Sequence, residues 1–319
     1  MEKNTGKTET LNYVLSRLCS FSSIKIGITS IGIDGEKTDQ VTNTHKPEIT
    51  LYPNTIFVTA EQFYNQKEII ANILSVSNQN SALGRLVTAK TISSGKVKLS
   101  GPGNTSWLKN VIEELKGFGS DIVLVDGALS RMSFGSPSIT DAMVLSTGAA
   151  LSIDIKTLVK KTAFVYRMSQ LPQVQENLSL RLINIEQGIW AIDNEDNIID
   201  LKIPSILMIE NNKEKIFAYG KRIFISGIIT DKLMQFLLAQ KDVDKIEIII
   251  RDFTRVFASI ENINRFLQKQ GKLYVAQRTN LIAITVNPTS PSGYNLNSEE
   301  LINALKKEIP IPIYNIKEI

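Results

Sequence analysis

The sequence predicts an α/β fold with a mostly parallel sheet, followed by a second α/β module. Three observations support this class. A glycine turn at residue 6 leads directly into an amphipathic helix, and an all-apolar strand ends in an acid at Asp126. Strands that are covered on both faces of a parallel sheet have this continuous apolar character. Strand and helix patterns then alternate again from residue 216 to residue 319.

The first residues carry a phosphate-binding motif. Met1 is followed by EKNTGKT, so Gly6, Lys7 and Thr8 match the end of the Walker A pattern, G-x-x-x-x-G-K-[ST]. In such a loop, backbone N–H groups surround the phosphates, the lysine carries positive charge to them, and the threonine hydroxyl binds magnesium. We therefore expect Asn4, Thr5, Gly6, Lys7 and Thr8 to bind a nucleoside triphosphate, with Thr8 as a ligand of Mg2+.

The loop begins at the first residue of the sequence. In the usual spacing the first glycine of the motif would fall on Met1, and the strand that leads into the loop would lie upstream. We expect the polypeptide to be a shortened form of a longer one. The alternative is that the sheet is completed in another way and the loop is partly disabled.

The segment after the loop predicts a helix. Its apolar residues recur at intervals of three and four, and they are Leu11, Val14, Leu15, Leu18 and Cys19. The positive N-terminal end of this helix would face a bound anion.

Two acidic residues are candidates for work beside the phosphates. Residues 121–126 read DIVLVD, a Walker B pattern in which Asp126 would stand at the carboxyl end of a buried strand and hold the magnesium. The alternative is a plain core strand that a turn aspartate ends before Gly127. Asp34 follows another apolar strand, at 24–33, and begins a polar turn. The candidate catalytic residues are thus Lys7, Asp126 and Asp34, and the motifs predict a P-loop NTPase fold whose leading strand is missing.

We expect three parts along the chain. Residues 1–160 form the nucleotide-binding domain, 161–215 a β-rich bridge or insert, and 216–319 a C-terminal α/β module. Within the first part we expect strands at 55–59, within 86–99 and at 142–146, and helices near 61–75, after a cap at Asn104 or Thr105, and after Asp154. The bridge contains an antiparallel hairpin of GIWAID and NIIDLKI. The last part has strands at 222–226, 245–251, 273–276 and 282–286, with helices from Thr230, near 260–268 and after Asn297.

Composition excludes several classes of function. The chain has 319 residues, and its 36 basic and 32 acidic residues are scattered, which indicates a solvated surface and no nucleic-acid binding. Apolar runs are short, and the N-terminus lacks a basic region followed by a hydrophobic stretch, so we expect neither a membrane span nor a signal peptide. With one histidine, His45, no zinc site is encoded, and the single Cys19 lies on the apolar helix face, where core packing is expected. One cysteine suits a reducing cytosol, so we expect a cytoplasmic protein.

Taken together, the segments EKNTGKT, TSIGIDGE and DIVLVDGALSR resemble the P-loop group that includes dethiobiotin synthetase, and Glu2 stands where those enzymes carry an acid in the loop. More closely, the order and wording of the motifs are similar to the KamB-type reactivase subunit of lysine 5,6-aminomutase, an adenosylcobalamin-dependent enzyme of lysine fermentation. The likeness spans most of the chain. It implies ATP-driven exchange of damaged cobalamin in the mutase, together with a MutS-like partner subunit, and it is compatible with a homodimer.

Three functions remain open from the sequence. The first is an ATPase that reactivates a cobalamin enzyme, and the second is an ATP-dependent small-molecule ligase of the dethiobiotin synthetase type. The third is a non-catalytic scaffold that responds to nucleotide. No [NT]KxD segment is present, which favours ATP over GTP, and the adenine could contact the backbone or the loop at Val286–Pro288. Phosphoryl transfer needs no protein nucleophile, so the scarcity of His and Cys is no obstacle.

Overall fold

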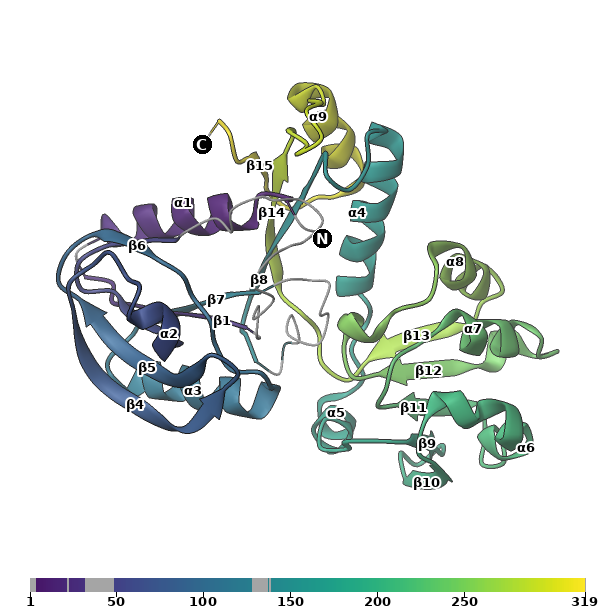
Figure 1. Ribbon diagram of the computed structural model, residues 1–319. Helices are drawn as coiled ribbons and strands as arrows, with labels where there is room; N and C mark the ends of the chain where they lie inside the picture. Colours follow the sequence, from purple (N-terminus) through teal and green to yellow (C-terminus); the bar gives the residue numbers. More distant parts are fainter. Residues whose placement is uncertain (1–3, 22, 32–48, 128–136, 138, 319) are drawn as a thin grey trace.

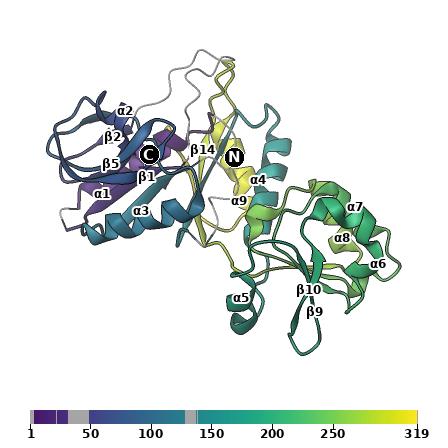
Figure 2. The ribbon, with the colours of Figure 1, turned by 60° about the horizontal axis from the view of Figure 1, so that its bottom comes forward.

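The computed structural model describes residues 4–21, 23–31, 49–127, 137 and 139–318. These residues form an α/β molecule, which confirms the predicted class. The three larger sheets, which we name A, C and D, have helices beside them, as Figures 1 and 2 show. Sheet C lies between sheets A and D in both views. The expected mostly parallel sheet is found only in part, because sheet A is mixed and sheet C is parallel.

Sheet A has the strand order β4-β5-β3-β1-β7. Its strands are β1 (Ile26–Ser30), β3 (Ile56–Ala60), β4 (Ala71–Ser81), β5 (Gly84–Thr91) and β7 (Ile122–Asp126). The apolar strand β1 is buried along its whole length and pairs in parallel with both β3 and β7. The β4–β5 hairpin adds two antiparallel strands beside β3 and makes the sheet mixed.

Helices α1 (Lys7–Cys19), α2 (Glu61–Tyr64) and α3 (Thr105–Gly117) accompany sheet A. A small antiparallel pair, β2 (Ile49–Leu51) with β6 (Gly95–Val97), lies next to it. Asn104 caps α3, as expected, because its Oδ1 accepts the N–H of Trp107 at 2.8 Å. The start of α1 and its amphipathic pattern are likewise confirmed.

The helix expected near residues 61–75 is wrong beyond its first turn. Helix α2 ends at Tyr64, and the chain enters β4 at Ala71. The segment ANILSVSNQNS contains serines, asparagines and β-branched residues, which are poor helix formers. Pairing with β5 satisfies its backbone groups instead, so the tertiary context decides for a strand.

Sheet C consists of three parallel strands in the order β15-β14-β8. They are β8 (Met143–Gly148), β14 (Leu281–Asn287) and β15 (Ile313–Asn315). The chain therefore returns to pair β14 with β8 after building the whole of sheet D. Helices α4 (Ile155–Ser169) and α9 (Ser298–Glu308) pack against this sheet and begin at the expected caps, Asp154 and Asn297.

Sheet D has the order β10-β9-β11-β12-β13. The expected hairpin of β9 (Ile189–Ile192) and β10 (Ile198–Ile203) is confirmed, and β11 (Arg222–Ile225), β12 (Glu247–Ile250) and β13 (Lys272–Val275) run parallel. One face packs against α7 (Asp231–Leu238) and α8 (Ile260–Gln268), and the other against α5 (Glu176–Leu182). Short turns complete the module: η2 (Ile206–Asn212), α6 (Lys213–Ile216), η3 (Val243–Lys245) and η4 (Phe253–Arg255).

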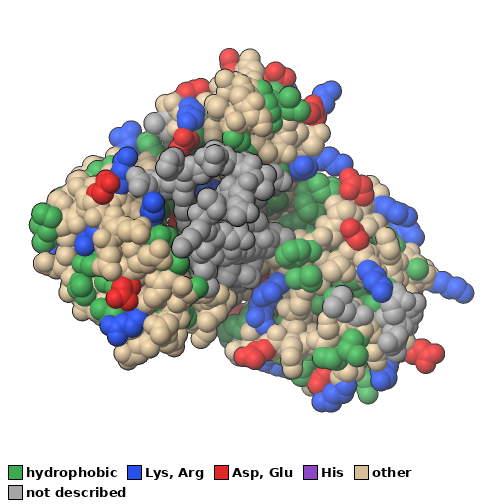
Figure 3. Space-filling view, viewed as in Figure 1, with side chains coloured by type: hydrophobic (Ala, Val, Ile, Leu, Met, Phe, Trp, Pro, Cys, Tyr) green, Lys and Arg blue, Asp and Glu red, His purple; other side chains and the backbone are tan. Residues whose placement is uncertain are grey.

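The last two features of the fold are the charge pattern of the surface and the length and polarity of the helices. On the face in Figure 3, basic and acidic side chains are interspersed, as expected for a solvated surface. Among the helices that the structure describes, none combines the length and the apolar character needed to cross a bilayer.

Candidate functional site

The candidate site begins with the loop of residues 4–8. Asn4 and Gly6 have φ of 61° and 85°, in the left-handed region, and Gly6 is the N-cap of α1. Thr5 between them is 1% exposed, whereas Lys7 and Thr8 form the half-buried first turn of the helix. Its N-cap is a glycine, which makes no side-chain hydrogen bond to the first turn of this 13-residue helix.

A buried group of three hydroxyls holds this helix on sheet C. Thr10 Oγ1 donates to the carbonyl oxygen of Gly6 at 2.9 Å and lies 2.8 Å from Thr285 Oγ1 of β14. Ser146 Oγ of β8 lies 2.9 Å from Thr285 Oγ1 and 3.3 Å from Thr10 Oγ1. The loop is therefore held against β8 and β14, two strands that are distant from it along the chain.

Asn287, the last residue of β14, also contacts the loop. Its Nδ2 donates to the carbonyl oxygen of Asn4 at 3.4 Å. A Cβ on Gly6 would lie 3.1 Å from the Cβ of Asn287, so the backbone of the loop passes close to this strand end. Near the chain end, Lys317 Nζ reaches Glu9 Oε1 of α1 at 2.6 Å. Asn287 lies within Val286–Pro288, the segment for which the sequence suggested a contact with the adenine of ATP.

Asp126 stands where the sequence predicted, at the carboxyl end of β7. It is half-buried and lies in register with Ser30, the last residue of β1, and its carbonyl oxygen accepts the N–H of Ile31 at 2.9 Å. Gly101 passes over the same edge, since a Cβ there would lie 1.7 Å from the carbonyl oxygen of Ser30. From the sequence alone, Gly101 is only the first residue of a Gly-Pro-Gly-Asn turn. Its position between a strand and a capped helix is the one sequence signal for this close approach.

Helix α1 connects the two parts of the site. Its Leu15 is buried in one cluster with Ile28 of β1, and Leu124 of β7 packs against that cluster. The structure thus brings residues 4–8 together at the start of α1 and sets Asp126 on a strand that packs with the same helix. Asp34 lies outside the described residues, as does His45, so neither prediction is tested.

The single cysteine, Cys19, stands at the other end of α1 from the loop. Burial raises the pKa of its thiol, and a contact with Thr55 Oγ1 at 3.9 Å opposes this shift only in part. This environment supports the expected packing role of Cys19 and disfavours the reactive thiolate.

In the part of the chain that the structure describes, no group of three or more His, Cys, Asp or Glu side chains is arranged to hold a metal. A magnesium ion here would depend on Thr8, Asp126 and the phosphates.

Comparisons of the chain with protein-family models, with curated proteins and with solved structures find no match.

Proposed function

We propose that this chain binds Mg-ATP at residues 4–8 and hydrolyses it slowly. The observation that carries the proposal is the junction at Gly6, where a left-handed glycine at the N-cap leads into a helix whose first residues are Lys7 and Thr8. Such a terminus offers several backbone N–H donors and the positive end of the helix dipole to a phosphate. Its attachment to Thr285 and Asn287 supports a loop that is pre-organised for the anion.

In this proposal each residue has a separate task. Lys7 neutralises charge on the β- and γ-phosphates, and the Thr8 hydroxyl binds magnesium. Asp126 holds the same ion from the end of β7. Asn287 lies against the loop and is the candidate for contact with the adenine. ATP and Mg2+ are the cofactors.

For the purpose of the cycle we propose reactivation of an adenosylcobalamin-dependent lysine 5,6-aminomutase, together with a MutS-like partner subunit. This step rests on the resemblance of the three sequence segments. A damaged cofactor stays tightly bound, so its release needs a change between two mutase states that this chain binds with different affinity. ATP hydrolysis would reset the cycle.

The nucleotide part is tested by titration of Mg-ATP into the chain and into Lys7→Ala. We expect Lys7→Ala to lose binding, because no other side chain of the loop carries positive charge to the phosphates. Lys109→Ala is the matched control, since Lys109 is an exposed lysine of α3. Equal affinity of Lys7→Ala and Lys109→Ala would contradict the proposal.

The reactivation part has its own experiment. A mutase inactivated during turnover should regain activity only when this chain, its partner, Mg-ATP and fresh adenosylcobalamin are all supplied. Recovery without this chain would remove the reactivase function and favour the ligase. ATP binding without hydrolysis, in the presence of all components, would favour the nucleotide-responsive scaffold.

A further inference from the structure

Strand β4 is an end strand of sheet A, and Figure 1 shows it at the outer side of the sheet. With 11 residues it is the longest strand that the structure describes. It pairs with β5 on one side, and on its other side no described strand accepts or donates a hydrogen bond. The outer backbone N–H and C=O groups of such a strand form a template on which a further strand can pair.

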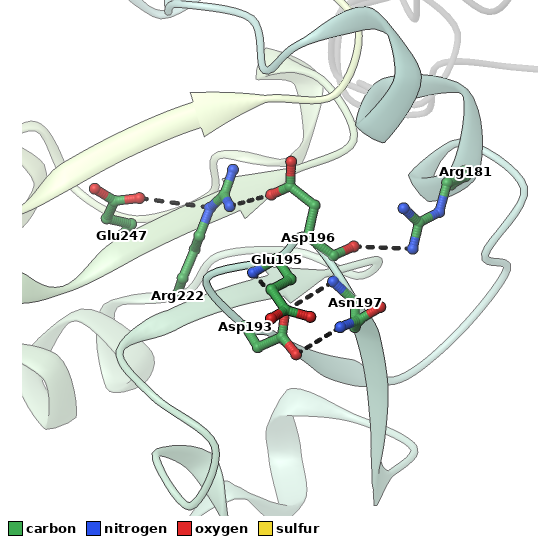
Figure 4. Close-up of polar contacts among 7 residues, drawn as sticks. All are labelled: Arg181, Asp193, Glu195, Asp196, Asn197, Arg222 and Glu247. Carbon is green, nitrogen blue, oxygen red and sulfur yellow. Dashed lines mark hydrogen bonds and ion pairs between the residues drawn. The ribbon is translucent and has the colours of Figure 1, made fainter.

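At the corresponding edge of sheet D, charged side chains oppose such pairing. Asp200 and Lys202 lie on the end strand β10 and form an ion pair at 2.8 Å. Arg222 of β11 binds Asp196 in the turn that leads into β10, as Figure 4 shows. Charges and prolines on an edge strand hinder its association with another chain. The edge of sheet A lacks both, because residues 69–84 contain neither a charged residue nor a proline.

The β4–β5 hairpin also exposes large apolar side chains. Ile73 of β4 is 54% exposed, and the register shift between Ile73 and Ser75 leaves the exposed Leu74 outside the pairing with β5. Ile70 and Ile92 flank the hairpin and are 65% and 52% exposed. The N–H of Ile92 donates to the carbonyl oxygen of Ile70 at 2.8 Å, so these two side chains belong to neighbouring segments. Removing this apolar surface from water would stabilise an association.

We propose that β4 pairs with β4 of a second copy of this chain, antiparallel and about a twofold axis, so that sheet A continues from one copy into the other. Around such an axis each residue meets residues of its own segment, and a charge there would face a like charge. The uncharged residues 69–84 avoid this repulsion. They also offer no charge by which a different protein could be selected, and this favours the second copy as the partner.

A pair of strands centred near Ile73 and Leu74 brings the exposed apolar side chains of both copies together. The interface is separate from the proposed nucleotide site, because Asp126 lies on β7 at the opposite end of sheet A. It does not depend on the proposed nucleotide function.

The test is sedimentation velocity of the full chain without nucleotide, from about 1 to about 100 μM. We expect an equilibrium between monomer and dimer in this range. Ile73→Lys should weaken the association about tenfold or more, because both copies then carry a like charge in the interface. Ile153→Lys is the matched control, since Ile153 is a 67% exposed isoleucine outside sheet A, and it should leave the association unchanged.

Two further measurements address the pairing itself. Amide groups of residues 71–81 should exchange hydrogen more slowly in the concentrated sample than in the dilute one, because strand pairing protects the outer edge. Ile73→Lys and Ile73→Glu should each associate weakly, whereas their equimolar mixture should recover the association through opposite charges. A folding defect in either variant would not be repaired by mixing.

Three outcomes would overturn the proposal. The first is a monomer at every concentration, which would leave the edge to a different partner. The second is equal association of Ile73→Lys and Ile153→Lys, or association without slower exchange in residues 71–81, and either would place the interface elsewhere. The third is a mixture of the Ile73→Lys and Ile73→Glu chains that associates no better than each chain alone.

Discussion

The hydroxyl groups of Thr10 and Thr285 lie 2.8 Å apart, although 275 residues separate them in the chain. This contact joins the helix behind the candidate phosphate loop to β14, a strand of the C-terminal region. Ser146 of β8 completes the group, and all three side chains are buried. The position of the loop therefore depends on sheet C, and substitutions in that sheet can act on the loop.

The first prediction concerns the hydroxyl of Thr10 within this group of three. Thr10→Val should lower the free energy of unfolding by about 1–2 kcal/mol, since Thr10 loses its bond to Gly6 while Ser146 and Thr285 still pair with each other. Urea unfolding measures the change. Thr10→Ser keeps the hydroxyl and should retain more of the stability. If the serine and valine variants are equally stable, the hydroxyl contributes nothing.

The second prediction concerns Gly6. Gly6→Ala should destabilise the chain by about 1–2 kcal/mol, because φ is 85° and the new Cβ would meet Asn287 at 3.1 Å. Mg-ATP binding should weaken as the loop shifts. The control is Gly117→Ala, which adds a Cβ with no atom within 4 Å and should leave stability equal or higher. Thermal unfolding of the two variants distinguishes them, and equal melting temperatures would argue against a constraint at Gly6.

Much of the local structure could be predicted from the sequence. The spacing of apolar residues and the capping residues predicted α1, α3, α8 and the start of α9. The side chains of Asn104 and Asn297 accept backbone N–H groups of the first turn, as asparagine commonly does at an N-cap. The assignment of strands to sheets could not be predicted. The pairing of β14 with β8 joins residues that are distant in sequence, and no periodicity reports such a contact.

For the candidate site, the motif patterns selected residues 4–8 and Asp126, and the structure places them at the start of α1 and at the end of β7, while their roles stay predictions. The motifs gave no sign of Thr10, Ser146 and Thr285, which are ordinary hydroxyl residues until the fold brings them together. The same holds for Gly101, whose close approach to Ser30 appears only when β1 and the turn before α3 are placed.

The third prediction is a pH dependence at Asp231, the first residue of α7. Its Oδ1 accepts from Asn262 Nδ2 at 2.7 Å and from the N–H and hydroxyl of Ser259, and these bonds hold the pKa of Asp231 below its usual range. A carboxyl group with a depressed folded-state pKa stabilises the fold above its unfolded pKa of about 4, and this contribution is lost as the pH falls through the folded value. Asp231→Asn should therefore be less stable at pH 7.

The measurement is chemical unfolding of both chains from pH 7 to pH 3. The difference in stability between the unsubstituted chain and Asp231→Asn should shrink as the pH falls below about 4. Asp244→Asn, at an exposed position of the same module, serves as the control and should change stability little. A difference that stays constant over the whole range would assign the effect to packing and not to ionisation.

The fourth prediction separates two roles that the proposed nucleotide site gives to Lys7 and Asp126. Lys7→Ala should abolish binding, whereas Asp126→Asn should bind ATP with similar affinity and hydrolyse it at least about tenfold more slowly. The reason is that the carboxylate acts through magnesium, and its contribution grows as charge develops on the transferred phosphoryl group. Asparagine keeps the size of the side chain at the half-buried end of β7, so the strand pairing with Ser30 should persist. Titration with Mg-ATP and a phosphate-release assay give the two quantities independently. An equal loss of affinity and rate, together with a lower melting temperature, would instead make Asp126 the structural end of a core strand.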